Sequence, residues 1–380
     1  MKILQVISYF NPKFGGDINV CTNLSKQLAK RNHEVTIITT DFCFDGLYAD
    51  TIRGEGVSVI PFPCRAHYGL FLYTPSIKNW LEKNLMEFDV IHLHNYRSHQ
   101  NAVVRIFSLR YKIPYIVQAH GNVLPLFEKL FLKKCFDMVW GKKILKNAAL
   151  CIALTKTESD QYEKMGVPIK KIAIIPNGID ISQYDDLPLR GQFRSKYQIP
   201  KEVRIILSLG RIHKIKGIDL LISAFSRLCS KMSDVKLVIA GPDEGDLSQI
   251  QEQIRELKLE NDVLFTGPLY GKAKIEAYVD ADVYVLPSRY ESFSNTVLEA
   301  WACETPVIAT KNCCISDTIR YTDDSAVVEF DPVQMQEKIL DLLTHEEKRK
   351  KMGLKGKKLV QDNFDISKVV QKIEEIYETI

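Results

Sequence analysis

Short apolar runs rich in isoleucine and valine recur along this chain, and stretches with helical spacing of apolar residues separate them. The first half contains the runs KILQVIS, HEVTIITT, DVIHLH, PYIVQAH and LCIALT. A nearly continuous apolar strand is typical of a parallel sheet covered on both faces, because neither face then meets water. Strands of this kind in alternation with helices predict a doubly wound α/β sheet.

The alternation breaks once and then restarts. Residues 176–200 carry three prolines and two glycines, which is typical of a linker, and the runs VRIILSLGRI, VKLVIAG, DVLFTG, ADVYVLPS and PVIAT follow. A chain of 380 residues is also too long for one ordinary core. We therefore predict two domains, at residues 1–175 and 201–360, joined by this linker and followed by a last segment at 361–380. Ligands of such sheets bind at the carboxyl ends of the strands, and two facing domains predict a central cleft.

The composition narrows the class of protein. Hydrophobic residues make up 46% and charged residues 26%, as in a soluble globular protein, and a net charge of +4 gives no argument for nucleic acid. No run of 18 apolar residues predicts a membrane span, and the start MKILQVISYF is interpreted as a first strand rather than a signal peptide. Nine cysteines without a C-x-x-C pair indicate reduced thiols, so we expect a cytoplasmic protein.

Glycines and histidines mark the strand ends of the first domain. Gly15 and Gly16 follow the first strand, where they either let backbone N–H groups approach an anion or simply form a flexible turn. The dinucleotide fingerprint G-x-G-x-x-G is absent. His94 and His120 end two further strands and are candidates for substrate contact, whereas His92 is interpreted as a core histidine. No nearby cysteine or carboxylate completes a metal site, and we predict none.

Two cations follow the first strand of the second domain. Arg211 and Lys216 lie in LGRIHKIKG, and a guanidinium fork with a lysine point charge would suit a diphosphate. The alternative is a solvated loop. Asp280 and Asp282 form an Asp-x-Asp pair of the kind that can hold a divalent ion. They lie at the wrong end of their strand for the cleft, so we interpret them as a cap or turn.

Two glutamates flank the start of a predicted helix in SRYESFSNTVLEAWA. Ser294 or Asn295 can cap this helix, and its first N–H groups suit a phosphate. Glu291 lies in the preceding loop. Glu299 lies among apolar residues, where an acid needs donors such as ribose hydroxyls. The alternative for Glu299 is an exposed glutamate that stabilises the helix start.

A basic and aromatic stretch, Phe127–Lys146, belongs to a long amphipathic segment of the first domain. It carries six lysines against Glu128 and Asp137, together with three phenylalanines and a tryptophan. Such a stretch fits an interfacial surface that anionic lipid attracts. It equally fits a helix that covers the sheet with its apolar side and keeps its lysines in water.

In combination, these motifs resemble glycosyltransferase family 4. The likeness rests on GG after the first strand, HG at 120–121, IPNGID at 175–180, GRIHKIKG at 210–217 and the E-x7-E arrangement. It covers nearly the whole chain and implies the GT-B fold, with two Rossmann-like domains facing a central cleft. It further implies a retaining transfer from a nucleotide sugar, UDP- or GDP-linked, to a glycan or lipid-linked acceptor. Glycan, glycolipid or cell-envelope polysaccharide synthesis is the expected setting, with no metal cofactor and a location in the cytoplasm or at the inner face of the membrane.

The resemblance also implies roles for individual residues. Arg211 and Lys216 would bind the donor diphosphate, and Glu299 would bind the ribose hydroxyls. Glu291 would hold the hydroxyls of the transferred sugar, and His120 would contact that sugar near the reacting centre. The remaining expected contacts comprise the donor side at Gly16, Phe293, Ser294, Asn295 and Thr296, and the acceptor side at Gly15, Asp17 and His94.

The resemblance assigns the first domain to the acceptor, the second to the nucleotide sugar, and brings the last helix back onto the first domain. Two positions depart from the family's usual glycine, namely Asn32 and Glu304. Other functions remain open: a sugar-nucleotide epimerase or a phosphorylase on the same fold, or a two-domain sugar-binding module without catalysis. The missing dinucleotide fingerprint disfavours an oxidoreductase.

Overall fold

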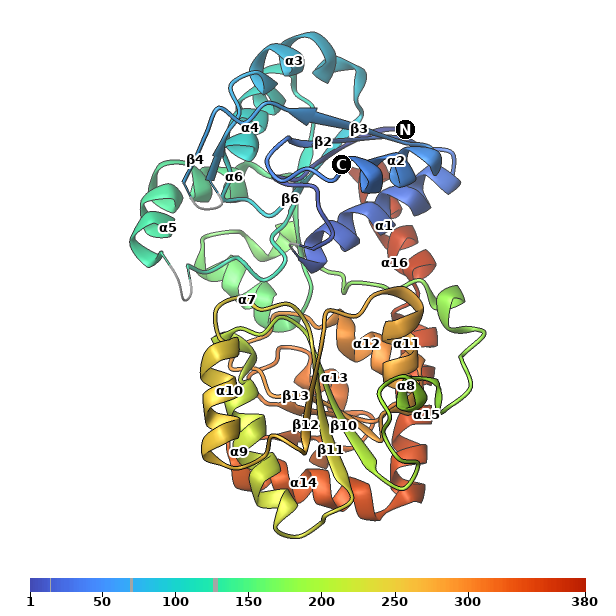
Figure 1. The fold of residues 1–380 in the computed structure, drawn as a ribbon. Helices are drawn as coiled ribbons and strands as arrows, with labels where there is room; N and C mark the ends of the chain where they lie inside the picture. Colours follow the sequence, from blue (N-terminus) through green and yellow to red (C-terminus); the bar gives the residue numbers. More distant parts are fainter. Residues whose placement is uncertain (14, 69–70, 126–128) are drawn as a thin grey trace. The chain divides into compact units, whose positions relative to one another are not determined.

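The computed structural model describes residues 1–13, 15–68, 71–125 and 129–380, and these form two compact units. The first unit comprises Met1–Gly178 and Ile366–Ile380, and the second comprises Ile179–Asp365. The chain therefore passes between the units twice, and each unit has its own parallel sheet (Figure 1). None of the described helices is long and apolar enough to cross a membrane.

The sheet of the first unit has seven described strands in the order β3-β2-β1-β6-β7-β8-β9, all parallel. Its strands are β1 (Lys2–Val6), β2 (Glu34–Thr40), β3 (Val57–Phe62), β6 (Val90–His94), β7 (Tyr115–Gln118), β8 (Leu150–Ala153) and β9 (Ile172–Ile174). Ile3 of β1 lies opposite Val35 and Val90 in the neighbouring strands. The strand order reverses between β1 and β6, which is the place where ligands of doubly wound sheets bind.

Helices cover both faces of this sheet, as its apolar strands predict. The helices are α1 (Gly16–Lys30), α2 (Gly46–Gly54), α3 (Ile77–Asn84), α4 (His99–Tyr111), α5 (Leu130–Phe136), α6 (Lys142–Asn147), α7 (Lys156–Lys164) and α16 (Ile366–Thr379). Ile3 of β1 packs with α1, α2 and α16, whereas Leu4 packs with α3, α4 and α6 on the other face. A small antiparallel hairpin, β4 (Ala66–Tyr68) and β5 (Phe71–Tyr73), stands outside the sheet.

The last helix completes the first unit. Val370 and Ile373 of α16 share a buried cluster with Leu24 and Leu28 of α1. In Figure 1 the red α16 lies beside the blue α1. The core of the first unit thus joins the two ends of the chain.

The second unit repeats the doubly wound plan with six described strands in the order β12-β11-β10-β13-β14-β15, all parallel. They are β10 (Arg204–Leu209), β11 (Val235–Ala240), β12 (Val263–Gly267), β13 (Val283–Leu286), β14 (Val307–Thr310) and β15 (Val327–Val328). Leu207 of β10 lies opposite Val238 and Tyr284. The order reverses between β10 and β13, so a second ligand-binding edge is expected there.

The helices of the second unit follow the same alternation and end in a helical tail. They are α8 (Gln192–Lys196), α9 (Ile218–Cys229), α10 (Leu247–Glu256), α11 (Gly271–Asp280), α12 (Asn295–Ala302), α13 (Ser316–Arg320), α14 (Pro332–Thr344) and α15 (Glu346–Asn363). Within residues 176–200, the part from Ile179 onward belongs to this unit, and α8 packs on α11.

Two positions that carry glycine in the resembled family have left-handed backbone here. Asn32 follows α1 with a φ of 66°, and Glu304 follows α12 with a φ of 60°. Asparagine tolerates this conformation well, whereas a glutamate adopts it at some cost in strain. Asn32 thus stands at the C-terminal end of α1, a position that asparagine tolerates in place of glycine.

The long amphipathic segment that contains the stretch Phe127–Lys146 is not one regular α-helix in the part that the structure describes. Leu126, Phe127 and Glu128 lie outside the described residues. The remainder consists of α5, a π-helical turn at Asp137–Gly141, and α6. The buried ion pair of Asp137 with Arg97, with atoms 2.7 Å apart, lies at this turn.

Candidate active site

A pocket opens at the carboxyl ends of β10 and β13, where the strand order of the second unit reverses. Its described lining comprises Ser208, Leu209, Gly210, Arg211, Lys216, Ile218, Leu286, Pro287 and Ser288. Both predicted cations therefore lie at the same strand edge. This is the position at which doubly wound sheets bind their ligands.

Acidic partners hold the two cations of this pocket. An Nη1 atom of Arg211 lies 2.5 Å from Oε2 of Glu244, and the Arg211 side chain is 44% exposed. Lys216 pairs with Glu291, and this pair is much less exposed. The lysine and the glutamate that the sequence placed 75 residues apart thus form one charged pair at the pocket, where neither side chain is a solvated surface group.

Two further features of the pocket favour an anion. The hydroxyl of Ser288 is fully buried and lacks a hydrogen-bond partner within the described residues. Ser294 occupies the N-cap of α12, but its side chain does not cap the helix and bonds the hydroxyl of Thr296 at 2.7 Å. Of the two expected caps, Ser294 or Asn295, Ser294 holds the N-cap position, but its side chain does not satisfy the first N–H groups of α12.

The remaining residues of the α12 start have structural contacts. Thr296 Oγ1 lies 2.6 Å from the hydroxyl of Tyr284 in β13, which fixes the beginning of the helix to the strand. Asn295 is the first residue of α12. Phe293 is buried and its ring lies 6.2 Å from that of Phe364. The side chains of Phe293, Ser294 and Thr296 are thus engaged in contacts within the second unit.

Glu299 is held by two donors that sequence reasoning missed. Its Oε1 lies 2.6 Å from Nζ of Lys274, and the hydroxyl of Tyr278 donates to its Oε2 at 3.1 Å. The side chain of Glu299 is only 14% exposed. The reading of Glu299 as a surface glutamate is therefore wrong. Both donors lie in α11. The sequence alone does not indicate that a lysine or tyrosine of one helix contacts a glutamate of another.

Arg289 is another residue that the sequence did not single out. Its guanidinium donates to both carboxylate oxygens of Asp219, at 2.7 and 2.5 Å, and to the carbonyl oxygen of Lys214 at 2.7 Å. Its own backbone N–H donates to the carbonyl of Ile215 at 2.8 Å. Arg289 therefore clamps the loop that carries Lys216 onto the end of β13. The only available signal was its place in SRYES, directly after a strand.

The glycine pair of the first unit lies at the corresponding edge of its sheet. Gly15 precedes α1 and Gly16 is its first residue. Asp17, in the first turn, accepts a hydrogen bond at 2.7 Å from the Nδ2 atom of Asn95, which follows β6. This hydrogen bond thus joins the start of α1, which follows β1, to the residue that follows β6. Asn95 itself has a left-handed φ of 62°, a conformation that often marks functional turns.

Three histidines of this unit, His92, His94 and His120, form a stack. His92 and His94 are fully buried with ring centroids 4.4 Å apart, and His120 lies beside His94 with a distance of 2.9 Å between its Nε2 and the Nδ1 of His94. His92 is the expected core histidine. His94, expected on the acceptor side, reaches His120 rather than the surface. Among the described residues, no group of three or more His, Cys, Asp or Glu side chains is placed to hold a metal ion.

The buried carboxylate of Glu158 accepts a hydrogen bond from the turn that carries His120. His120 has a left-handed φ of 51°, and the N–H of Gly121 donates to Glu158 at 2.6 Å. The other carboxylate oxygen of Glu158 accepts from the N–H of Leu154, also at 2.6 Å. Burial raises the pKa of Glu158 to about 7, against the opposite effect of these two hydrogen bonds. Glu158 thus fixes the backbone of the turn without reaching its surface.

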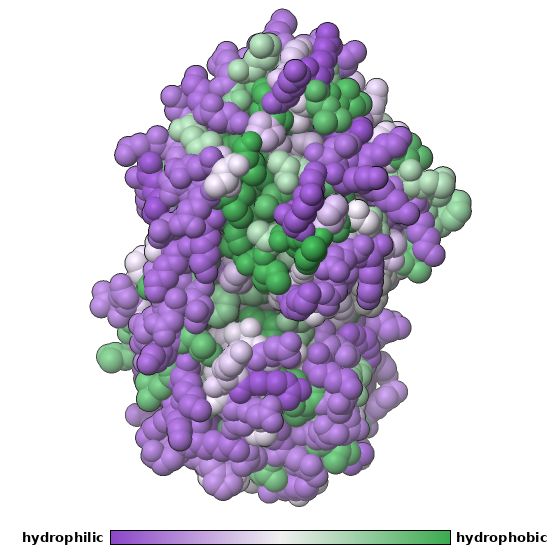
Figure 2. All heavy atoms as spheres, turned by 180° about the vertical axis from the view of Figure 1, so that it is seen from behind, coloured by the Kyte–Doolittle hydropathy of each residue, from purple (hydrophilic) through white to green (hydrophobic). Residues whose placement is uncertain are grey.

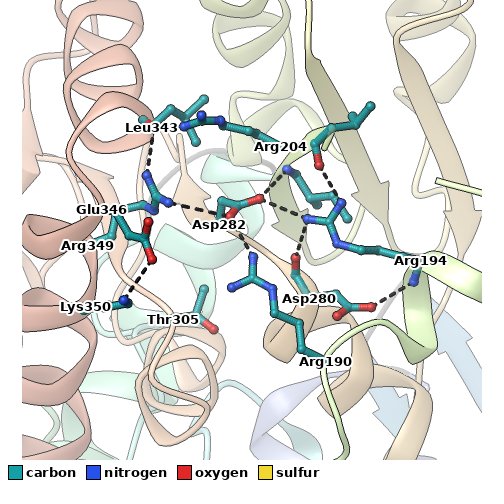
Figure 3. A network of polar contacts seen from close by, with 12 residues as sticks. Arg190, Arg194, Arg204, Asp280, Asp282, Thr305, Leu343, Glu346, Arg349 and Lys350 are labelled. Atoms are coloured by element: carbon teal, nitrogen blue, oxygen red, sulfur yellow. Dashed lines mark hydrogen bonds and ion pairs between the residues drawn. The ribbon is translucent and has the colours of Figure 1, made fainter. Parts of the chain in front are cut away.

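Asp280 and Asp282 form a structural network at the opposite end of β13 (Figure 3). Asp282 pairs with Arg190 at 2.7 Å and Arg194 at 3.1 Å and accepts the N–H of Ile205 at 2.8 Å. Asp280 accepts the N–H of Arg194 at 2.8 Å. The sequence predicts a cap or turn role for this pair, and both carboxylates accept backbone N–H groups of neighbouring segments. These buried carboxylates thus anchor α8 to the sheet.

A basic and apolar surface occupies α5, the π-helical turn and α6, and we call it the α5–α6 surface. Phe131 is 77% exposed and Met138 is 73% exposed. The acid of this stretch within the described residues, Asp137, is buried against Arg97, so it does not offset the surface lysines. In the reverse view, green apolar spheres reach the surface at the edge where α5 projects (Figure 2). Phe127, which the expected stretch includes, lies outside the described residues.

Comparison with known proteins identifies the family. The family described as Glycosyltransferase Family 4 matches residues 14–183, and the family described as Glycosyl transferases group 1 matches residues 190–359. N-acetyl-alpha-D-glucosaminyl L-malate synthase of Bacillus anthracis is 26% identical over 96% of this chain and 94% of its own. Phosphatidyl-myo-inositol mannosyltransferase of Mycolicibacterium smegmatis is 24% identical over 100% of this chain and 94% of its own.

The fold has solved counterparts. The crystal structure of Anabaena HepE in complex with UDP and glucose superimposes with a TM-score of 0.85, covers 100% of both chains and is 19% identical. The match establishes the GT-B arrangement of two parallel-sheet α/β domains. Together with the two matching families, it shows that this chain is a GT-B glycosyltransferase of family 4.

Proposed function

We propose that this enzyme transfers a sugar from a nucleoside-diphosphate sugar to an acceptor hydroxyl with retention of the anomeric configuration. The product would be a glycolipid or another cell-envelope glycan. The observation that carries the proposal is the pocket at the β10–β13 edge, where Arg211 and Lys216 meet the buried hydroxyl of Ser288. Cations and a hydroxyl donor in one pocket suit a diphosphate leaving group.

In this mechanism the largest contribution to the activation energy comes from the negative charge that develops on the departing diphosphate. Arg211 offers a planar fork and Lys216 a point charge, and the N–H groups at the start of α12 add donors. These groups would stabilise the leaving group without a metal cofactor. The acceptor hydroxyl would attack on the face that the diphosphate leaves, and a phosphate oxygen would take its proton. The protein's contribution is then position and charge.

The carboxylate of Glu291 is placed to orient the transferred sugar. It pairs with Lys216, so its remaining lone pairs can accept sugar hydroxyls directly beside the diphosphate group. We propose that His120 contacts the same sugar from the first unit, and that Gly15, Gly16 and Asp17 serve the acceptor or the diphosphate. His94 would act through His120.

The proposal is tested first by a thermal-shift screen against UDP-, GDP- and ADP-sugars with the matching nucleoside diphosphates. The structural likeness to a UDP-bound enzyme makes UDP-sugars the first choice. A ligand that binds only the folded state raises the melting temperature in proportion to the logarithm of its concentration. A donor that stabilises the protein is then incubated with it in the absence of an acceptor. Release of free sugar in this assay measures hydrolysis of the donor, as distinct from transfer. No shift with any nucleotide would contradict the proposal.

Replacing Glu299 with glutamine is expected to weaken binding of the nucleoside diphosphate about tenfold, the factor that one lost hydrogen bond produces. The carboxylate, fixed by Lys274 and Tyr278, can offer lone pairs to two ribose hydroxyls, whereas an amide offers one oxygen. Isothermal titration calorimetry measures the change. Glu304→Gln is the matched control, because Glu304 follows the same helix and pairs with Lys357 at its surface. Equal affinity of Glu299→Gln and wild type would remove the ribose assignment.

We also propose that the α5–α6 surface binds anionic membrane, which would bring the enzyme to a lipid-linked acceptor. Exposed apolar side chains can enter the lipid interface while lysines meet the negative headgroups. The described members of the surface are Lys129, Leu130, Phe131, Leu132, Lys133, Lys134, Met138, Val139, Trp140, Lys142, Lys143 and Lys146. The charge is therefore complementary to an anionic bilayer.

Replacing Phe131 with serine is expected to lower the fraction of protein that floats with phosphatidylglycerol vesicles several-fold, because burial of a phenylalanine in the interface is lost. The Lys142→Ser, Lys143→Ser double variant is expected to do the same and to reduce the salt dependence. Leu189→Ser is the control, since Leu189 is 81% exposed outside this surface. Equal flotation with phosphatidylcholine and phosphatidylglycerol would exclude the charge-dependent binding.

A further inference from the structure

A continuous chain of hydrogen bonds runs from the last helix to His120. The hydroxyl of Tyr377 in α16 lies 2.7 Å from Nδ1 of His92 and 3.3 Å from Nε2 of Gln5. Oε1 of Gln5 lies 2.7 Å from Nε2 of His94, whose Nδ1 in turn lies 2.9 Å from Nε2 of His120. Gln5, His92, His94 and Tyr377 are buried, and His120 is the partly exposed end.

The three histidines of this hydrogen-bond chain, His92, His94 and His120, are neutral near pH 7. Burial lowers the pKa of His92 to about 3 and the pKa of His120 to about 4, and it places the pKa of His94 well below its usual value. Asp17 acts in the opposite direction on the pKa of His120 without cancelling the effect. A neutral imidazole has one N–H donor and one acceptor nitrogen. Each contact along the chain therefore determines the next one.

The direction of the chain is set by the amide group of Gln5. Its Nε2 donates to the hydroxyl oxygen of Tyr377 at 3.3 Å, which leaves the single proton of that hydroxyl for Nδ1 of His92, 2.7 Å away. His92 therefore accepts at Nδ1 and carries its own proton on Nε2, a buried atom without a hydrogen-bond partner in the described part of the protein.

Each remaining proton follows from this start. The carbonyl oxygen of Gln5 then accepts from Nε2–H of His94. The other nitrogen of His94 is consequently an acceptor, and His120 must supply the proton to it from its own Nε2. Nδ1 of His120 is left with a lone pair.

We propose that Tyr377, acting through Gln5 and His94, is a positioning residue that holds His120 in its Nε2–H tautomer. Nδ1 of His120 then accepts a hydrogen bond and does not donate one. If His120 contacts the donor sugar, as the proposed function requires, this tautomer selects a sugar hydroxyl that donates. This series of hydrogen bonds also links α16 to the site. Tyr377 determines which ring nitrogen of His120, 257 positions earlier in the sequence, carries the proton.

The test removes the Tyr377 hydroxyl and reads the tautomer directly. In full-length protein labelled with 15N-histidine, the two ring nitrogens of each neutral imidazole give separate signals, assigned with His92→Gln, His94→Gln and His120→Gln variants. Wild type is expected to show His120 protonated on Nε2 alone. In Tyr377→Phe the amide of Gln5 loses its fixed orientation, so we expect His120 to show both tautomers. Gln5→Leu, which interrupts the chain in its middle, is expected to do the same.

Tyr115→Phe is the matched control. Its buried hydroxyl donates to the carbonyl of Ile144 at 2.6 Å in the same unit but has no contact with the histidine chain. We expect this variant to keep the wild-type tautomer. The proposal is overturned if His120 carries its proton on Nδ1 in wild type, or if it keeps a pure Nε2–H tautomer in both Tyr377→Phe and Gln5→Leu.

Kinetics with a verified donor separate this inference from the proposed function. We expect Tyr377→Phe to lower kcat about tenfold, as for loss of one hydrogen bond in the transition state, with the donor KM nearly unchanged. Tyr115→Phe should retain both constants. The tautomer signals need no substrate, so failure of nucleotide-sugar binding would leave the proton assignment intact and would count against the proposed function alone.

Discussion

Lys216→Ala is expected to lower kcat by about 10²- to 10³-fold, the range found when one preorganised donor to a developing anion is removed. Lys216 lies in the pocket at the β10–β13 edge and forms a little-exposed pair with Glu291. Its removal takes a positive charge from the diphosphate and also leaves the sugar-orienting carboxylate without its partner. Both losses act in the transition state, so kcat should fall more than the donor KM rises.

Lys214→Ala is the matched control for this variant. Lys214 lies two residues away, is exposed, and contacts Arg289 only through its backbone carbonyl. Lys216→Arg should recover part of the activity, because the charge returns in a different shape. Turnover in Lys216→Ala within threefold of wild type, with a verified sugar nucleotide, would remove the diphosphate assignment.

Gly217→Ala is expected to lower the free energy of unfolding of the second unit by about 3–4 kcal/mol, near the upper end for single substitutions. Gly217 has a φ of 66°, where a Cβ atom is strained, and that Cβ would lie 2.1 Å from the carbonyl oxygen of Pro287. Backbone atoms on both sides must move to relieve the contact. The change would also displace the neighbouring Lys216, so activity should fall as well.

Urea unfolding measures this effect. Of the three tryptophans, Trp301 is the one in the second unit, so a Trp80→Phe, Trp140→Phe background reports that unit by fluorescence. Gly271→Ala is the control: Gly271 has a φ of 51°, but no atom lies within 4 Å of its added Cβ. It should cost about 1 kcal/mol, from backbone strain alone. Equal losses in the two variants would show that the close approach to Pro287 is relieved at no cost.

The sequence predicted ten of the described strands, because each of these is a short apolar run between polar segments; it did not predict β3, β9, β15 or the β4–β5 hairpin. Central strands such as β6, β7 and β13 are buried along their whole length, so their pattern is strong and local. It failed where a local signal competes with tertiary contacts. The stretch around Asp137 has helical spacing throughout, but the buried pair with Arg97 coincides with a π-helical turn. Ser294 is a similar case, since it holds the N-cap position of α12 but its side chain bonds Thr296 instead.

The residues of the candidate site could be found where polar groups stand at strand ends. Arg211, Lys216 and Glu291 have that position, and the structure brings them to one edge. Residues that act through them carry no such mark. Lys274 looks like any helical lysine, although its ammonium holds Glu299. Tyr377 looks like an ordinary core residue until its hydroxyl is seen beside His92.

By itself, the sequence determined that there are two large parallel sheets and at which strand ends a ligand can bind, because burial on two faces and the residue types of loops are local properties of the sequence. Only the tertiary structure decided the partners: which acid meets Lys216, which donors hold Glu299, and which tautomer His120 adopts. Those contacts join positions up to 372 residues apart, as between Gln5 and Tyr377. Hydrogen-bond direction depends on atoms within about 3 Å, and only the folded backbone brings such distant atoms together.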